Sequence, residues 1–98
     1  MIIVIAIVAM LAPATAQAAT MAVDMKNNMF TPQEITIQAG DTVTWTNQDQ
    51  AKHDVNFGDF KSPLLSKGET YSHTFETAGT YDYVCDVHPF MKGRVIVQ

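Results

Sequence analysis

Short runs of alternating apolar and polar side chains dominate the sequence after residue 20. The clearest are residues 34–38 and 42–46, where the apolar positions are β-branched or aromatic. This alternation is typical of a strand with one buried face, because successive side chains point to opposite sides of a strand. Further runs occupy residues 53–57, 71–75, 80–85 and 94–97, with a weaker one at 21–25. Turn residues separate the runs at the spacing expected of a β-sandwich, so we predict two small antiparallel sheets packed face to face.

The first part of the chain has a different composition. Residues 1–19 carry no charge, and the apolar run 2–12 has the length of a signal-peptide core. An A-x-A cleavage pattern follows at residues 16–18. We predict a signal peptide at residues 1–18, export to the periplasm, and one domain at 19–98. An uncleaved membrane anchor is the alternative, because no Lys or Arg precedes the apolar run.

Charge and size limit the kinds of function that the domain can have. The chain has 6 basic and 10 acidic residues, a net charge of −4. Nucleic acid and anionic membranes attract basic surfaces, so we expect neither as a partner. A domain this small usually gains stability from a disulfide, a metal or a partner subunit. The sequence has a single cysteine, which excludes an internal disulfide and favours a metal at Cys85.

The stretch CDVHPFMKG at residues 85–93 contains three side chains that bind soft or borderline metals. Cys85, His88 and Met91 recur there at every third position. Pro89 disfavours helical backbone at His88, so the segment must curl to bring its donors together, because three extended residues span about 10 Å. Structural zinc sites rarely use methionine. One cysteine, two histidines and a weak axial methionine form the ligand set of blue-copper sites.

A second histidine must come from another part of the chain, and two candidates remain. His53 lies at the start of the predicted strand 53–57, near one end of the sandwich. His73 lies in the middle of the run 71–75, farther from any strand end. We favour His53 because binding residues gather where strands end in loops. His73 is expected to be an ordinary strand residue.

The sequence also resembles a known family, the cupredoxins, and within them the amicyanin group. The resemblance extends from about residue 30 to residue 97, through the segments 40–47 and 78–85 and the short Cys-x2-His-x2-Met spacing. It implies a Greek-key β-sandwich of about seven to eight strands that holds one type 1 copper per chain. The implied ligands are His53, Cys85, His88 and Met91.

The resemblance places other residues around the implied copper. They are Asn47, Asp54 and Asp86. The family commonly has asparagine where this chain has Asp54, and the amicyanin group has threonine and proline where Asp86 and Val87 stand. Lys52 likewise replaces a proline. We hypothesise that an ionised carboxylate near copper favours Cu(II) and lowers the reduction potential.

These features predict a small soluble one-electron carrier, monomeric, with no enzymatic activity and no small-molecule substrate. Electrons are expected to pass through the exposed edge of His88. Pro89 and Phe90 then form a small docking patch for transient redox partners, unless Phe90 serves only to pack the loop. The resemblance implies an amine dehydrogenase and a c-type cytochrome as possible partners, although the altered residues beside His53 and Cys85 weaken the first.

Two other functions are compatible with parts of the sequence. A periplasmic copper chaperone or copper buffer of the same fold is the main alternative, because Met21, Met25 and Met29 are spaced by four and could bind Cu(I). An immunoglobulin-like module that binds proteins without metal is the other. That second reading leaves the spacing of the three donors in the loop unexplained.

Overall fold

The computed structural model describes residue 3 and residues 17–98, and the predicted signal peptide lies almost entirely outside these residues. The described chain forms seven strands and no helix. The strands are β1 (Thr20–Lys26), β2 (Met29–Thr31), β3 (Glu34–Ile37), β4 (Thr42–Asn47), β5 (Thr70–Thr74), β6 (Gly79–Val84) and β7 (Lys92–Val97). The described residues contain no helix that is long and apolar enough to cross a membrane. The all-β prediction is confirmed.

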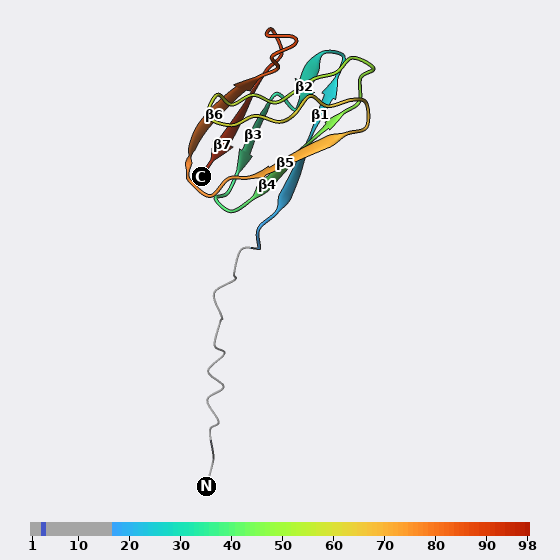
Figure 1. The fold of residues 1–98 in the computed structure, drawn as a ribbon. Helices are drawn as coiled ribbons and strands as arrows, with labels where there is room; N and C mark the ends of the chain where they lie inside the picture. The colour runs from blue at the N-terminus through green and yellow to red at the C-terminus, as the bar shows by residue number, and fades with distance from the viewer. Residues whose placement is uncertain (1–2, 4–16) are drawn as a thin grey trace.

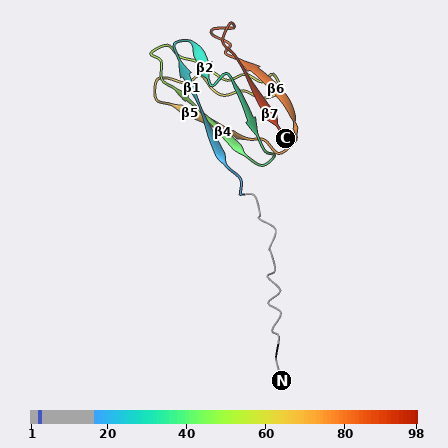
Figure 2. The ribbon, with the colours of Figure 1, turned by 180° about the vertical axis from the view of Figure 1, so that it is seen from behind.

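The strands form two sheets that pack face to face (Figures 1 and 2). One sheet has the order β2-β1-β4-β5 and the other the order β3-β7-β6. The prediction of purely antiparallel sheets is wrong, because β1 pairs with β4 in parallel and β3 pairs with β7 in parallel. Both parallel pairs join strands that are distant in sequence. They arise because long connections cross between the sheets and bring a later strand beside an earlier one in the same direction.

The core lies between the sheets and is rich in aromatic rings. Along β4, buried and half-buried residues alternate as predicted, with Val43 and Trp45 fully buried. Trp45 contacts Tyr83 and Phe57 edge to face, with ring centroids 5.5 and 5.7 Å apart. Burial of this kind, together with favourable ring geometry, makes aromatic side chains strong contributors to a small core. The contact between Trp45 and Tyr83 joins β4 of one sheet to β6 of the other.

Residues 53–57 do not form the predicted strand. They make only isolated bridges, from His53 to Leu65 and from Asn56 to Lys61 and Val84. His53, Asp54 and Val55 are all buried, so the segment has no solvent face and no two-residue alternation. In contrast, β2 was not predicted, because a strand of three residues is too short to show a pattern. Residues 58–68 are irregular, with isolated bridges at Lys61 and Leu65.

One end of the sandwich carries the loop singled out by the sequence. The chain leaves β6 at Val84, forms a loop over residues 85–91, and returns as β7. Figure 1 shows this loop, in brown and red, at the end of the domain opposite the point where residues 17–19 enter it. Residues 53–57 lie at the same end. The backbone of His53 is hydrogen-bonded to Leu65, and the backbone of Asn56 is hydrogen-bonded to Val84 at the end of β6. The fold therefore brings both predicted ligand segments to one end.

Candidate metal centre

Three side chains with metal-binding atoms converge at this end of the domain. His53 Nδ1, Cys85 Sγ and His88 Nδ1 all lie within 4.8 Å of one another. His53 Nδ1 is 3.1 Å from His88 Nδ1 and 3.7 Å from Cys85 Sγ, and His88 Nδ1 is 4.0 Å from the same sulfur. His53 and Cys85 are fully buried, whereas His88 is partly exposed. The structure brings His53, and not His73, together with Cys85 and His88.

The loop that supplies Cys85 and His88 is closed by its own backbone. The N–H of Cys85 donates to the carbonyl of Met91 at 3.1 Å, and the N–H of Met91 donates to the carbonyl of His88 at 2.8 Å. These two bonds fold the segment back on itself, as the short spacing required. Met91 is buried with only 2% of its surface exposed, so its thioether is held inside the same end of the domain.

Hydrogen bonds of side chains hold the other ligand segment. The fully buried Asn47, at the end of β4, donates from Nδ2 to the carbonyls of Ala51 and Leu65, both at 2.9 Å. Its Oδ1 accepts the N–H of Asp49 at 2.9 Å. Because Leu65 in turn pairs with the backbone of His53, Asn47 supports the turn that presents this histidine. The family resemblance implies that Asn47 lies beside the site, and the structure gives this residue a bracing contact.

Asp49 is a residue of the site that sequence reasoning missed. Its Oδ2 lies 2.9 Å from His53 Nε2, and its two oxygens also accept the backbone N–H groups of Asn27 and Asn28 at 2.9 and 3.0 Å. Partial burial raises the pKa of this carboxyl, but the hydrogen bonds from Asn28, His53 and Asn27 outweigh burial and lower the pKa overall. An aspartate in a loop gives no signal that separates it from an ordinary turn residue.

The two ligand segments are joined through Asp54 and Asp86. Asp54 is buried and its Oδ1 accepts the N–H of Asp86 at 2.6 Å. The Asp86 side chain accepts a hydrogen bond from Asn56 Nδ2 at 2.7 Å, and Lys61 Nζ lies 3.7 Å away. The bond from Asn56 is the main reason that the pKa of Asp86 is lowered. Both carboxyl groups therefore connect the segment of His53 to the loop of Cys85.

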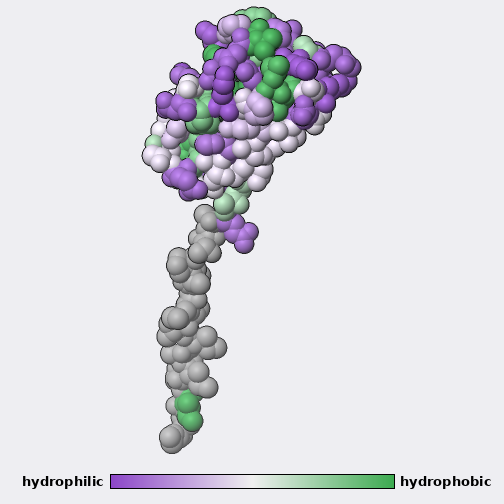
Figure 3. Space-filling view, in the orientation of Figure 1, coloured by the Kyte–Doolittle hydropathy of each residue, from purple (hydrophilic) through white to green (hydrophobic). Residues whose placement is uncertain are grey.

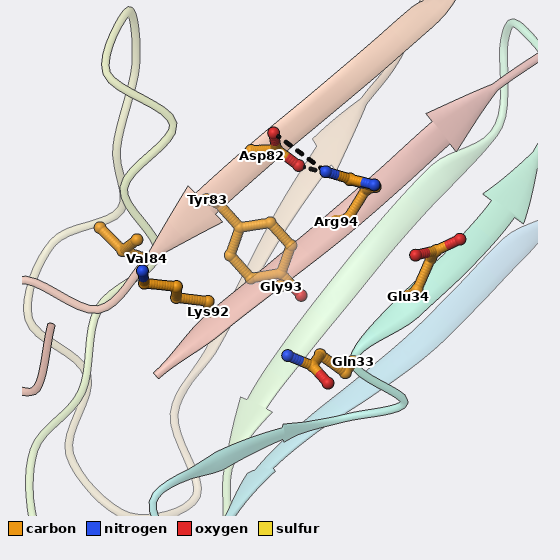
Figure 4. Close-up of a pocket in the computed structure, with 8 residues that line it drawn as sticks. All are labelled: Gln33, Glu34, Asp82, Tyr83, Val84, Lys92, Gly93 and Arg94. Atoms are coloured by element: carbon orange, nitrogen blue, oxygen red, sulfur yellow. Dashed lines mark hydrogen bonds and ion pairs between the residues drawn. The ribbon is translucent and has the colours of Figure 1, made fainter. Parts of the chain in front are cut away.

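The base of the loop depends on a close approach between Tyr83 and Gly93. These residues face each other across β6 and β7 on the buried side, and Figure 4 shows the Tyr83 ring lying over Gly93. A β-carbon at Gly93 would come within 2.2 Å of the ring. Burial raises the pKa of Tyr83 to about 12. Gly93 thus makes room for the aromatic core directly below the ligand loop.

The pocket in Figure 4 is separate from the converging donors. It has a volume of about 530 Å³ and is lined mainly by residues of β6 and β7, with no ligand candidate among them. Asp82 and Arg94 in its wall pair with each other at 2.6 Å. That ion pair lowers the pKa of Asp82 and raises the pKa of Arg94, so neither group is set up as an acid or base near neutral pH.

Apolar side chains surround the exposed part of His88. Phe90 is 69% exposed, its ring centroid 5.9 Å from that of His88, and Val87 is 50% exposed. Pro89 between them is also exposed. Figure 3 shows hydrophobic side chains, in green, gathered at this end of the domain. We call Val87, His88, Pro89 and Phe90 the loop patch.

The exposure of His73 and of three methionines bears on two other predictions from the sequence. His73 lies in β5, partly exposed, with its ring stacked on Phe60 at a centroid distance of 4.0 Å, and partial burial lowers its pKa. It is the ordinary strand histidine that was predicted. Met25 is fully buried in the core, whereas Met21 and Met29 are 40% and 58% exposed. The three methionines therefore do not face one another at a common surface site.

Comparison with known proteins agrees with this architecture. The family model described as a cupredoxin-like domain matches residues 1–97. The chain belongs to the cupredoxin-like family. It is 45% identical to amicyanin-alpha of Methylorubrum extorquens, over 70% of this chain and 64% of that protein, and 41% identical to amicyanin of Paracoccus denitrificans, over 78% and 63%. It therefore spans just under two thirds of the length of these relatives.

A solved structure gives the same result. A variant of amicyanin in its Cu(I) state superposes with a TM-score of 0.78 and 40% sequence identity, covering 81% of this chain and 82% of that one. The resemblance to the amicyanin group is therefore confirmed by sequence and by fold.

The donor atoms of this chain fit copper. A thiolate and two imidazoles suit Cu, Zn and Fe, whereas Mg²⁺ and Ca²⁺ require oxygen ligands. Cys85 is the only thiol in the sequence, which disfavours the multi-thiolate sites of structural zinc. The buried position of Met91 beside this set completes the combination found in type 1 copper sites.

Proposed function

We propose that this protein is a type 1 copper protein that carries single electrons between redox partners. The observation that carries the proposal is the convergence of His53 Nδ1, Cys85 Sγ and His88 Nδ1 within 4.8 Å from two distant segments. Met91 supplies the fourth, axial donor, and one copper binds per chain. When bound, copper supplies a one-electron couple whose potential the surrounding residues adjust.

The residues of this chain would keep the site rigid during electron transfer. His53 is held by Asp49 and by backbone hydrogen bonds to Leu65, and Cys85 directly follows β6 within the core. Cu(I) and Cu(II) favour different geometries, so a site that hardly moves offers both a compromise. Little then has to rearrange when an electron arrives or leaves. This is the property that a carrier needs, and no substrate has to be bound or transformed, so we propose no enzymatic activity.

His88 and the loop patch would form the route to the partner. His88 is the one partly exposed member of the converging set, and apolar Val87, Pro89 and Phe90 lie beside it. Redox encounters bury little area and stay weak, so that the carrier can leave after transfer. The buried Asp54 and the exposed Asp86 lie where the two ligand segments join, and their charges would adjust the reduction potential. The partners are other redox proteins, with an amine dehydrogenase and a c-type cytochrome as the partners suggested by the family.

We propose further that the carrier acts outside the cytoplasm as a monomer. The apolar segment 1–18 supports export and cleavage, which would leave the domain at 19–98 in the periplasm. A retained segment would instead anchor the domain to the membrane. The copper-chaperone alternative is weaker, because Met25 is buried and cannot form an exposed site with Met21 and Met29.

The experiment is to add Cu(II) to the purified protein and record visible absorption and electron spin resonance. We expect an intense blue band, reversible one-electron voltammetry, and copper that stays bound in both oxidation states. Cys85→Ser should abolish the band, whereas His73→Gln, which removes the histidine outside the site, should leave it unchanged. A wild type that binds Cu(II) without an intense band, or that readily gives its copper to an acceptor, would overturn the proposal.

A further inference from the structure

We propose that Asp49 is a positioning residue of the metal centre. Its carboxylate holds His53 in the tautomer that leaves Nδ1 free for the metal, and it ties this imidazole to the turn between β1 and β2. The part of this inference that concerns copper rests on the proposed function. The part that concerns the tautomer does not, because it follows from contacts that the protein makes by itself.

One carboxylate receives three donors from two distant parts of the chain. Oδ1 accepts the N–H of Asn27 at 2.9 Å, and Oδ2 accepts the N–H of Asn28 at 3.0 Å. Both asparagines have left-handed backbone, with φ of 55° and 56°, so this tight turn directs its two amides to the same side. The third donor, His53 Nε2, lies 2.9 Å from Oδ2. Asp49 is thus held at two points before it contacts the histidine.

The contact with Asp49 determines where the proton of His53 lies. An ionised carboxylate only accepts hydrogen bonds, so Nε2 of the neutral imidazole must carry the hydrogen. Its lone pair is then on Nδ1, the nitrogen that faces Cys85 Sγ at 3.7 Å and His88 Nδ1 at 3.1 Å. His53 is fully buried, so water does not compete for either nitrogen. Nδ1 of His53 is therefore directed at the other donors, whereas Asp49 holds Nε2.

The two histidines differ in their surroundings. His53 is fully buried, and its Nε2 lies 2.9 Å from Asp49 Oδ2. His88 is partly exposed, and its Nδ1 lies 3.1 Å from His53 Nδ1 and 4.0 Å from Cys85 Sγ. Asp49 therefore fixes the orientation of the buried histidine only.

Removing the carboxylate charge should weaken Cu(II) more than Cu(I). A ligated imidazole that donates its other N–H to a carboxylate is a more basic ligand, and loss of such a partner typically costs about 10- to 100-fold in metal affinity. Asp49→Asn should therefore lower Cu(II) affinity by about that factor, with a smaller loss for Cu(I). A higher reduction potential follows. A residue that only capped the turn would not change the ratio of Cu(II) affinity to Cu(I) affinity.

Asp24→Asn is the matched control. Asp24 is an aspartate on neighbouring β1, and its side chain accepts only a 3.3 Å hydrogen bond from exposed Gln48. The substitution Asp24→Asn removes the same charge as Asp49→Asn, at a residue that does not contact His53. We expect a raised potential and weaker Cu(II) binding in Asp49→Asn, and potentials close to wild type in Asp24→Asn. Equal shifts in both variants, or loss of stability in Asp49→Asn with an unchanged potential, would overturn the positioning role.

The tautomer can be read in the wild type, without a variant and without copper. Long-range ¹⁵N–¹H correlation spectra of the metal-free protein should show one histidine with a slowly exchanging Nε2–H and an unprotonated Nδ1, assigned to His53. A protonated Nδ1 on His53 would overturn the inference. This measurement stands apart from the proposed function: a wild type without a blue band refutes the electron carrier, whereas the ¹⁵N spectrum alone decides whether Asp49 sets the tautomer.

Discussion

The two segments that meet at the metal centre are built in opposite ways. The upstream segment, residues 47–53, is held by side chains: the buried Asn47 braces its backbone and the partly buried Asp49 anchors His53. The downstream loop, residues 85–91, is closed by two backbone hydrogen bonds and leaves Phe90 largely exposed. The first segment buries its ligand, His53, completely. The second keeps one ligand close to the surface.

This difference separates the two tasks of an electron carrier. A rigid ligand set keeps the geometry constant between oxidation states, and an accessible ligand lets a partner approach. A single segment could not easily do both, because the side-chain bonds that fix His53 also bury it completely. Dividing the ligands between a braced segment and a presented loop solves the conflict.

Removing the brace should have the largest effect. Asn47→Ala deletes three hydrogen bonds of a fully buried amide and leaves the carbonyls of Ala51 and Leu65 without this donor. Each unpaired buried group costs on the order of 1–3 kcal/mol, so we expect a loss of about 3 kcal/mol in the free energy of unfolding. Chemical denaturation of the metal-free protein measures it. Gln48→Ala, at an exposed neighbour, is the control, and equal losses would show that Asn47 braces nothing.

The base of the loop should not tolerate a larger side chain in place of Gly93. Gly93→Ala places a methyl group against the ring of Tyr83, which is buried and cannot swing into solvent. Overpacking of this kind costs roughly 1–3 kcal/mol. Lys92→Ala, at an exposed position beside it, should cost little. Thermal unfolding of both variants is the measurement, and a Gly93→Ala protein as stable as wild type would mean that Tyr83 has room to move.

Sequence reasoning succeeded where a repeating pattern was present. The alternation in β4 and the every-third-position donors in residues 85–91 are signals that survive without any knowledge of tertiary structure. The fold class and the loop ligands follow from them. His53 lies beside Cys85 and His88, but in an irregular segment and not at the start of a strand as expected.

The parts that could not be predicted depend on contacts between distant segments. Nothing local in the sequence indicates that Asp49 reaches back to the turn at residues 27–28, 21 and 22 positions away. The parallel pairing of β1 with β4 is equally invisible, because any strand with one apolar face can pair with any other. Side-chain bonds and strand order are decided by the whole fold. Patterns in the chain show only which segments are available.

The two carboxyl groups that join the segments should differ in their effect on copper. Asp54 belongs to the upstream segment and is buried, whereas Asp86 belongs to the loop, is exposed, and has Lys61 3.7 Å away. A buried charge is less screened, so Asp54→Asn should raise the reduction potential more than Asp86→Thr. For a unit charge at an effective dielectric of about 20, the change in Asp54→Asn is on the order of 1–2 kcal/mol. Voltammetry measures it, and no rise in either variant would sink the hypothesis.

Substitution of Phe90 should affect the association of the protein with its redox partners and leave stability and copper binding unchanged. Phe90→Glu places a charge in the loop patch, and Phe90 makes only an edge contact with His88. We expect the free energy of unfolding to change by less than about 0.5 kcal/mol, as for most surface substitutions, with an unchanged blue band. Electron self-exchange between Cu(I) and Cu(II) forms, followed by NMR line broadening, should slow, because two copies would meet with like charges at their patches.

The matched variant for this last test is Phe90→Leu, which keeps an apolar side chain. It should preserve the self-exchange rate if the ring serves docking through its apolar surface. Loss of the blue band in Phe90→Glu would instead mean that the ring packs the loop around its ligands. In that case the presented segment would owe its geometry to a side chain, as the braced segment does, and the contrast between the two would be smaller than their burial indicates.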